Sequence, residues 1–164
     1  MHAWYRFVAI GLGCVAAPAA AQDVLSTKQV SLELARDIAT RTLEACRAQG
    51  HQVSVVVVDR GGAPQVVLRD AYAARFTIEI AQRKANAVIL SGIESSALRK
   101  NRADIRAELN QIDGLLVLDG AVPIRAGGAL AGAVGVSGAP GGHVDEACAR
   151  KGVAAVQERL DFAD

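Results

Sequence analysis

The chain has 164 residues, of which 51% are hydrophobic and 4% aromatic, and its formal net charge is +1. That length suits a single domain, and the balanced charge lacks the basic excess that drives binding to nucleic acid or to an anionic membrane. Because aromatic residues are scarce, Val, Leu, Ile and Ala must build the core.

The first 21 residues predict an export signal. Arg6 lies in a short n-region, an apolar stretch follows, and Ala19–Ala21 form an A-x-A cleavage site before Gln22. The apolar run is shorter than the roughly 20 residues that a membrane span needs. Cys14 raises lipid attachment as a lesser alternative. We therefore expect residues 22–164 to form one mature domain, periplasmic or secreted, without a membrane anchor.

Removal of the signal leaves 17 Lys and Arg (18 less Arg6) against 17 Asp and Glu, so the formal net charge becomes zero. Two cysteines remain, Cys46 and Cys148, and their spacing forms neither a CxxC motif nor a metal-binding repeat. In an oxidising compartment they could form a structural disulfide, which would require the first and last helices to pack side by side. They could also be two small buried residues, and both interpretations stay open.

The first half of the chain predicts a helix and a hairpin. Apolar residues recur at three- and four-residue spacing over Ser31–Gln49, with Ser31 as N-cap and Gly50 as C′ residue. Val53–Asp59 is a β-branched run without alternation, which predicts a strand covered on both faces. Gln65–Arg69 can return antiparallel to it.

A second helix is predicted to end near Gly92. Tyr72 and Phe76 are four residues apart before or within it, and we interpret them as core or as one wall of a flat ligand's pocket. Lys84 lies on or beside the apolar side of this helix, where a buried ammonium needs a partner unless it snorkels to solvent.

The second half predicts a charged, solvated helix ending at Leu109, then three strands, then a last helix over Asp145–Leu160. The strands are Leu115–Asp119, Val122–Ala126 and Ala129–Ser137. Pro123 implies an edge strand, a strand start or a bulge. The order α-β-β-α-α-β-β-β-α with hairpin-type connections predicts an α+β fold, a five-stranded antiparallel sheet flanked by helices.

The junction before the last helix is the strongest candidate for function. A glycine-rich loop containing Gly138 and Gly142 leads to His143, Asp145 and Glu146. A neutral imidazole here is a competent axial haem or metal ligand, with either carboxylate able to orient its other nitrogen. The structural alternative is a histidine that only begins a helix.

Several segments together carry a resemblance to a known family. They are Ser31–Gly50, VSVVVVDRGGAP at Val53–Pro64, E-x-x-x-x-K-A at Glu79–Ala85, SSAL at Ser95–Leu98, and the glycine-rich end Gly120–Gly152. In this order and spacing, from about residue 30 to residue 156, the chain resembles the GlcG/HbpS-like haem-binding family, also found fused in PduO-type proteins.

The resemblance implies a profilin- or PAS-like α/β/α sandwich, a homo-oligomer, and haem as ligand, with a corrinoid less expected. The residues expected to bind the cofactor are Tyr72, Phe76, Lys84, Val122, Pro123, Gly138, Gly142, Asp145 and Glu146, with His143 as the metal ligand. Two departures matter. Val122 occupies the position where a Thr oxygen can approach haem iron, and His143 replaces an acidic residue that the family usually has.

Three functions therefore remain. The first is a periplasmic or secreted tetrapyrrole-binding protein with a sensing, buffering or accessory role. The second is a small-molecule enzyme that uses His143 with Asp145, Glu146 or Lys84 for acid–base chemistry. The third is an oligomeric accessory subunit without a small ligand.

Overall fold

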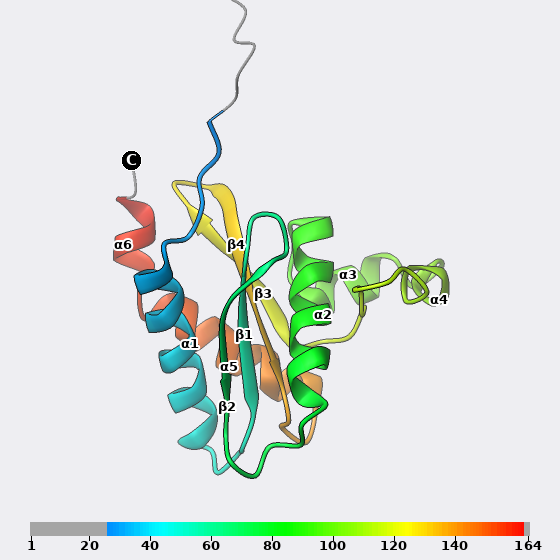
Figure 1. Cartoon of the computed structure of the whole chain (residues 1–164). Helices are drawn as coiled ribbons and strands as arrows, with labels where there is room; N and C mark the ends of the chain where they lie inside the picture. Colours follow the sequence, from blue (N-terminus) through cyan, green and yellow to red (C-terminus); the bar gives the residue numbers. More distant parts are fainter. Residues whose placement is uncertain (1–25, 163–164) are drawn as a thin grey trace, which may run out of the picture.

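The computed structural model describes residues 26–162, so the predicted export signal and its cleavage site lie outside the described residues. A four-stranded antiparallel sheet in the order β2-β1-β4-β3 forms the centre of the molecule (Figure 1). The strands are β1 (Ser54–Asp59), β2 (Pro64–Arg69), β3 (Ala121–Ala126) and β4 (Ala129–Ser137). The helices are α1 (Leu32–Arg47), α2 (Thr77–Ser91), α3 (Ser95–Asn101), α4 (Arg106–Leu109), α5 (Gly142–Ala154) and α6 (Gln157–Asp161).

The α+β class is confirmed, but the prediction of five strands was wrong. Residues 115–119 form no strand, because their backbone groups are bonded elsewhere. Leu116 N donates to Arg83 O on α2 at 3.1 Å, and Val117 N donates to Asn110 Oδ1 at 2.7 Å. An apolar run thus follows the side of a helix instead of joining the sheet.

Two helix boundaries also differ from the prediction. The segment up to Leu109 is split into α3 and α4, since residues 102–105 leave the helical path. The last helix begins at Gly142, three residues before Asp145, and α6 is a separate short helix. Asp145 and Glu146 therefore lie inside the first turns of α5, where their side chains can turn toward the body.

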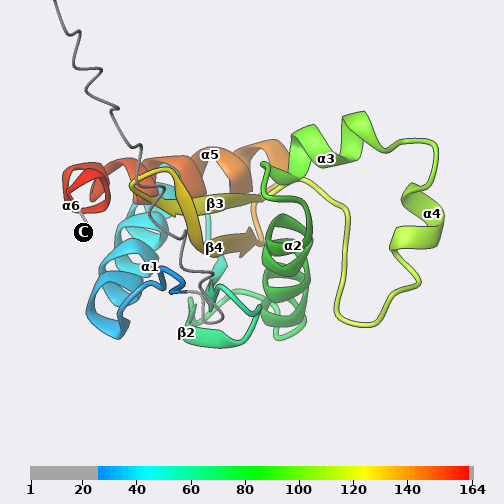
Figure 2. The ribbon, with the colours of Figure 1, turned by 90° about the horizontal axis from the view of Figure 1, so that it is seen from above.

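Helices lie on both faces of the sheet, α1 and α5 on one and α2 on the other (Figure 2). Along β1, Val55 and Val57 belong to the core under α1 and α5, whereas Val56 and Val58 belong to the core under α2. All four valines are buried, which confirms a strand covered on both faces. Pro123 lies in β3, an edge strand, as its missing N–H requires.

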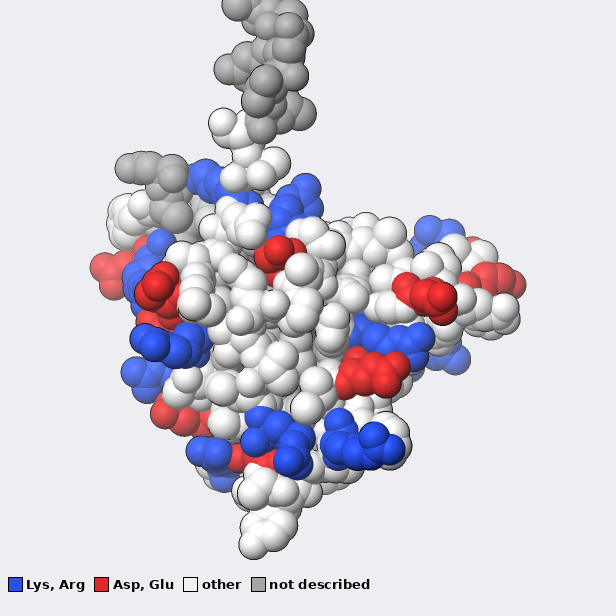
Figure 3. All heavy atoms as spheres, viewed as in Figure 1, with Lys and Arg blue, Asp and Glu red and all other residues white. Residues whose placement is uncertain are grey.

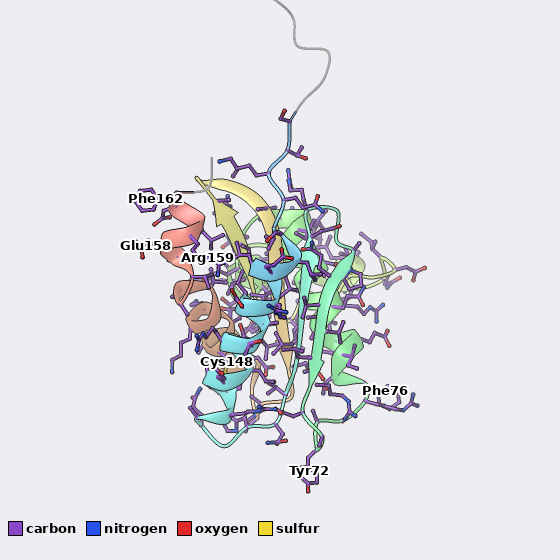
Figure 4. The ribbon with its side chains drawn as sticks, turned by 60° about the vertical axis from the view of Figure 1, so that its left-hand side comes forward. Tyr72, Phe76, Cys148, Glu158, Arg159 and Phe162 are labelled. Atoms are coloured by element: carbon purple, nitrogen blue, oxygen red, sulfur yellow. A yellow bond between two sulfur atoms is a disulfide. The ribbon has the colours of Figure 1, made fainter. Side chains whose placement is uncertain are left out.

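The three aromatic residues within residues 26–162 all lie at the surface. Tyr72 is 90% exposed, Phe76 58% and Phe162 79%, and Figure 4 shows them at the periphery of the ribbon. The interpretation of Tyr72 and Phe76 as core was therefore wrong. Arg75 stacks over the Phe76 ring, with its guanidinium carbon 4.0 Å from the ring centroid. Among the described residues, the hydrophobic part of the buried core consists of aliphatic side chains and two cysteines.

A disulfide joins α1 to α5. Cys46 and Cys148 are bonded with their Cα atoms 5.4 Å apart, which resolves the two interpretations that the sequence left open. Both residues are buried in the core between these helices. One turn later on α5, Gly152 lies so close to α1 that an added Cβ would overlap the Thr42 side chain. The two helices are thus held together by a covalent bond and by a close backbone approach.

Replacement of Gly152 with Ala is expected to lower the free energy of unfolding by about 1–2 kcal/mol. Ala favours an exposed helix by up to about 1 kcal/mol over Gly, but here its methyl group would push α5 away from Thr42, an overpacking that typically costs about 1–3 kcal/mol. Chemical denaturation measures the difference, with Lys151→Ala on the exposed side of α5 as control. A stabilised Gly152→Ala protein would contradict the described packing of α1 on α5.

The face viewed in Figure 1 has an uncharged centre. Figure 3 shows Lys, Arg, Asp and Glu mainly around its margins, with few charges over β2. β2 is an edge strand, and its Val67 is half-exposed. An apolar sheet edge suits contact with another protein surface, and the expected homo-oligomer stays a prediction. Among residues 26–162, no helix has the length and apolar character needed to cross a membrane.

Candidate functional site

The start of α5 carries a buried ion pair. Lys84 on α2 donates to Asp145 Oδ2 and to Val136 O, both at 3.0 Å, and Ala139 N donates to Asp145 Oδ1 at 3.0 Å. Lys84 is 1% exposed and Asp145 3%. This ammonium therefore has the partner that its burial demands. The pair connects α2, the end of β4, the glycine-rich loop and α5.

A second buried carboxylate lies beside the first. Glu146 accepts hydrogen bonds from Ser95 Oγ and Ser96 N at 2.9 Å and from Ser96 Oγ at 2.6 Å. Arg150, one turn later on α5, donates to Glu146 and to Glu94. Because Ser95 and Ser96 begin α3, Glu146 holds the start of α3 against the first turns of α5.

Two glycines make this arrangement possible. Gly120 has φ +130°, and an added Cβ would lie 2.6 Å from Lys84 Nζ and 2.9 Å from Val136 O. A Cβ on Gly142 would lie 2.5 Å from Asp119 O. The glycine-rich composition of this junction therefore allows backbone, ammonium and carboxylates to approach closely.

Burial raises the pKa of the Asp145 carboxyl, because a charged carboxylate loses its hydration. The charge of Lys84, the N–H of Ala139 and the hydrogen bond from Lys84 lower the same pKa, and His51 adds a smaller effect in that direction. Asp145 and Glu146 are thus fully engaged in holding elements together. Both side chains are buried away from solvent, so the geometry does not favour the acid–base enzyme.

His143 is the exposed member of the junction. Its imidazole folds back over Gly141, since a Cβ at Gly141 would lie 2.7 Å from His143 Cε1 and 2.8 Å from Nδ1. Within residues 26–162 the imidazole has no hydrogen-bonding partner, so the expectation that Asp145 or Glu146 orients it was wrong. The ring is therefore open to an external ligand on the surface of α5.

The other predicted site residues are distributed differently. Val122 is 3% exposed and belongs to the core under α1 and α5, and Pro123 is half-buried beside it. Gly138 has φ +134° and packs on the backbone of residues 52–53. Phe76 adjoins Thr77, whose hydroxyl lies 2.8 Å from that of Ser54, so Phe76 lies at the sheet end from which β1 begins.

Several residues around the buried carboxylates of Asp145 and Glu146 were not predicted from the sequence. Ser95, Ser96 and Arg150 complete the surroundings of Glu146, and Arg99 forms a two-pronged ion pair with Asp119 at 2.6 and 3.0 Å. The spacing of Glu146 and Arg150, four residues apart on a helix, could have indicated their contact. The remaining contacts link distant segments and have no local signal. Within residues 26–162, no group of three His, Cys, Asp or Glu side chains is arranged to hold a metal ion.

Comparison with known proteins identifies the family. The family model described as haem degrading protein HbpS-like matches residues 30–154. The chain belongs to the HbpS-like family. This confirms the resemblance to GlcG/HbpS-like proteins that the sequence indicated.

Solved structures extend the comparison. A double mutant of HbpS from Streptomyces reticuli has 38% sequence identity and a TM-score of 0.77, covering 87% of this chain and 98% of that chain. The Klebsiella pneumoniae protein ORFY has 20% identity and a TM-score of 0.75, covering 85% and 98%. A complex of PduOC with haem has 21% identity and a TM-score of 0.68, covering 77% and 94%. The last two show the shared fold alone, and no curated protein matches the chain significantly.

Proposed function

We propose that this HbpS-like protein binds haem at the junction where α5 begins, with His143 as the iron ligand. The main support for haem binding is the match to the HbpS-like family over residues 30–154. The 38% identity to the HbpS double mutant, over 98% of the HbpS chain, supports it further. His143 is assigned because its imidazole is exposed and has no competing partner among the described residues.

Among the candidate iron ligands, the chemistry of His143 fits haem and that of Val122 does not. A neutral imidazole is a common axial ligand of haem iron, whereas Val122 offers no oxygen and is buried. Lys84, Asp145 and Glu146 would act indirectly, because they fix the first turns of α5 on which His143 lies. Bound haem would supply a redox-active iron centre, and the protein would supply its binding and its access to solvent.

The proposed location is the periplasm or the exterior of the cell. The disulfide between Cys46 and Cys148 supports it, since such bonds persist in oxidising compartments. The export signal expected over residues 1–21 points the same way. In that compartment we propose a sensing, buffering or accessory role, performed by a homo-oligomer.

A haemin titration of residues 22–164, followed by absorbance, tests this function. The wild-type protein is expected to show a saturating Soret shift. His143→Ala is expected to weaken haemin binding by about tenfold or more, because even the indirect partners of a metal ligand typically contribute tenfold, and to shift or weaken the Soret band. His51→Ala, the other histidine of the mature chain, is the matched control.

Each outcome of the titration has a distinct meaning. An identical shift in wild type and His143→Ala would keep haem binding and remove His143 as the ligand. Loss of the shifted Soret band in His51→Ala alone would assign the iron ligand to His51 instead. A wild-type protein without any saturable shift would contradict haem binding and favour the oligomeric accessory subunit.

Haem degradation is a second candidate, because the family model that matches this chain is described as haem-degrading. It would be measured on the haem complex under air with a reductant such as ascorbate, by loss of the Soret band and release of chelatable iron. A Soret band that survives while free haemin bleaches would favour storage or sensing over degradation.

A further inference from the structure

The helices α3 and α4 form the sides of a surface groove. Figure 2 shows α3 and α4 joined by a short turn and projecting from the body beside α2. The groove has a volume of about 530 Å³. Its lining residues are Ser96, Ala97, Arg99, Lys100, Ala103 and Arg106. Three of the six side chains are cationic, none is acidic, and two are small and apolar.

Two of these cations are available to a ligand. Arg99 is already neutralised by its two-pronged ion pair with Asp119. Lys100 and Arg106 are exposed, and within residues 26–162 neither side chain has a hydrogen bond or an ion pair. Glu108 is two residues after Arg106, a spacing at which helical side chains do not face each other. The groove therefore presents two uncompensated positive charges.

The groove adjoins the junction that carries His143. Its inner wall includes Ser96, whose hydroxyl donates to Glu146 on α5 at 2.6 Å. His143 precedes Glu146 by three residues on that helix, about 4.5 Å along the axis. Asp119, the partner of Arg99, also approaches this helix, because its carbonyl lies against Gly142. Through the Ser96–Glu146 bond and the approach of Asp119 to Gly142, the groove adjoins the start of α5, which carries His143.

We propose that Lys100 and Arg106 bind the two propionate carboxylates of the haem whose iron His143 holds, an inference that rests on the proposed function. An arginine can pair with a carboxylate through two parallel N–H groups, and a lysine attracts it as a compact charge. Ala97 and Ala103 add short apolar side chains to the lining of the same groove. The charged segment predicted as a solvated face is exposed, as expected, and the proposal adds carboxylate binding to it.

The test compares haemin with its dimethyl ester, which keeps the iron and the macrocycle but lacks the carboxylates. For Lys100→Ala/Arg106→Ala, haemin affinity is expected to fall roughly three- to twentyfold, as for two exposed ion pairs. The affinity for the ester is expected to stay the same. Arg102→Ala is the matched control, because it removes a neighbouring charge that does not line the groove.

Other outcomes of this experiment distinguish a failure of the carboxylate site from a failure of haem binding. Unchanged haemin affinity in the double variant would overturn the carboxylate site, and so would an equal loss for haemin and ester. A wild-type protein that binds neither would instead contradict haem binding itself. Succinate is tested as a free dicarboxylic acid. If it binds the wild type saturably and the affinity for haemin is the same with and without succinate, the groove belongs to a free dicarboxylic acid and the propionate assignment is overturned. A melting curve like that of wild type shows that the double variant is folded.

Discussion

Replacement of Lys84 with Met is expected to lower the free energy of unfolding by about 3–5 kcal/mol, the typical cost of removing one partner from a buried ion pair. Lys84 is 1% exposed and binds both Asp145 and Val136 O. A methionine fills similar volume but leaves a buried carboxylate and a buried carbonyl without their donor. Denaturant titration measures the loss, and Lys151→Met, an exposed lysine on α5, is expected to change stability by less than about 0.5 kcal/mol.

The loss should depend on pH in a defined direction. Burial holds the pKa of Asp145 above its ordinary value, so this carboxyl stabilises the folded state at low pH and that contribution disappears as the pH rises through its folded pKa. Without Lys84 the same pKa rises further. The destabilisation by Lys84→Met should therefore be smaller at acidic than at neutral pH.

A double variant distinguishes the loss of the ion pair from the change in side-chain shape at residue 84. Lys84→Met/Asp145→Asn should recover part of the stability, because no unpaired charge remains and the amide oxygen can still accept from Ala139 N. A Lys84→Met protein as stable as wild type at neutral pH would contradict the buried pair. So would a loss that stays constant from acidic to neutral pH.

Removal of the disulfide by Cys46→Ala/Cys148→Ala is expected to lower the free energy of unfolding by about 4–5 kcal/mol. The bond closes a loop between residues 102 positions apart in sequence, and the chain-entropy account assigns about 4.7 kcal/mol to a loop of 100 residues. Because the bond joins α1 to α5, its loss should also loosen the core between these helices. Chemical denaturation of the variant and of wild type measures the difference.

Reduction provides the control for this prediction. Wild type treated with a thiol reductant should approach the stability of the double variant, while the double variant itself should not respond to the reductant. Thiol counting under denaturing conditions should find no free thiol in the oxidised protein of residues 22–164. Two free thiols, or equal stability of oxidised and reduced wild type, would contradict the disulfide.

The repeated local patterns of the sequence predicted most of the fold. The spacing of apolar residues predicted α1 and α2, and the β-branched run Val53–Asp59 predicted a strand buried on both faces. Pro123 indicated an edge strand, a strand start or a bulge, and the structure has the edge strand. The fifth strand was predicted wrongly because an apolar run satisfies its backbone along α2 as readily as in a sheet. That choice depends on Arg83 and Asn110, which are distant or follow no periodic pattern.

The site was predicted in part for a related reason. The glycine-rich loop and the chemistry of His143 could be recognised locally, and the need of Lys84 for a partner followed from its place on an apolar side. Its partner Asp145 lies 61 residues away, and only the tertiary fold brings them together. The exposure of Tyr72 and Phe76 was missed because a pair of aromatics four residues apart is a core pattern in most helices. Which residues of a charged helix line a groove likewise depends on the angle between α3 and α4.

The most direct test of haem binding at the start of α5 is the position of iron in crystals of residues 22–164 with haemin, located by anomalous diffraction at the iron edge. We expect the iron peak next to the His143 imidazole, with the propionates toward Lys100 and Arg106. An iron peak beside another residue, with His143 free in solvent, would contradict the assignment of this junction as the haem site.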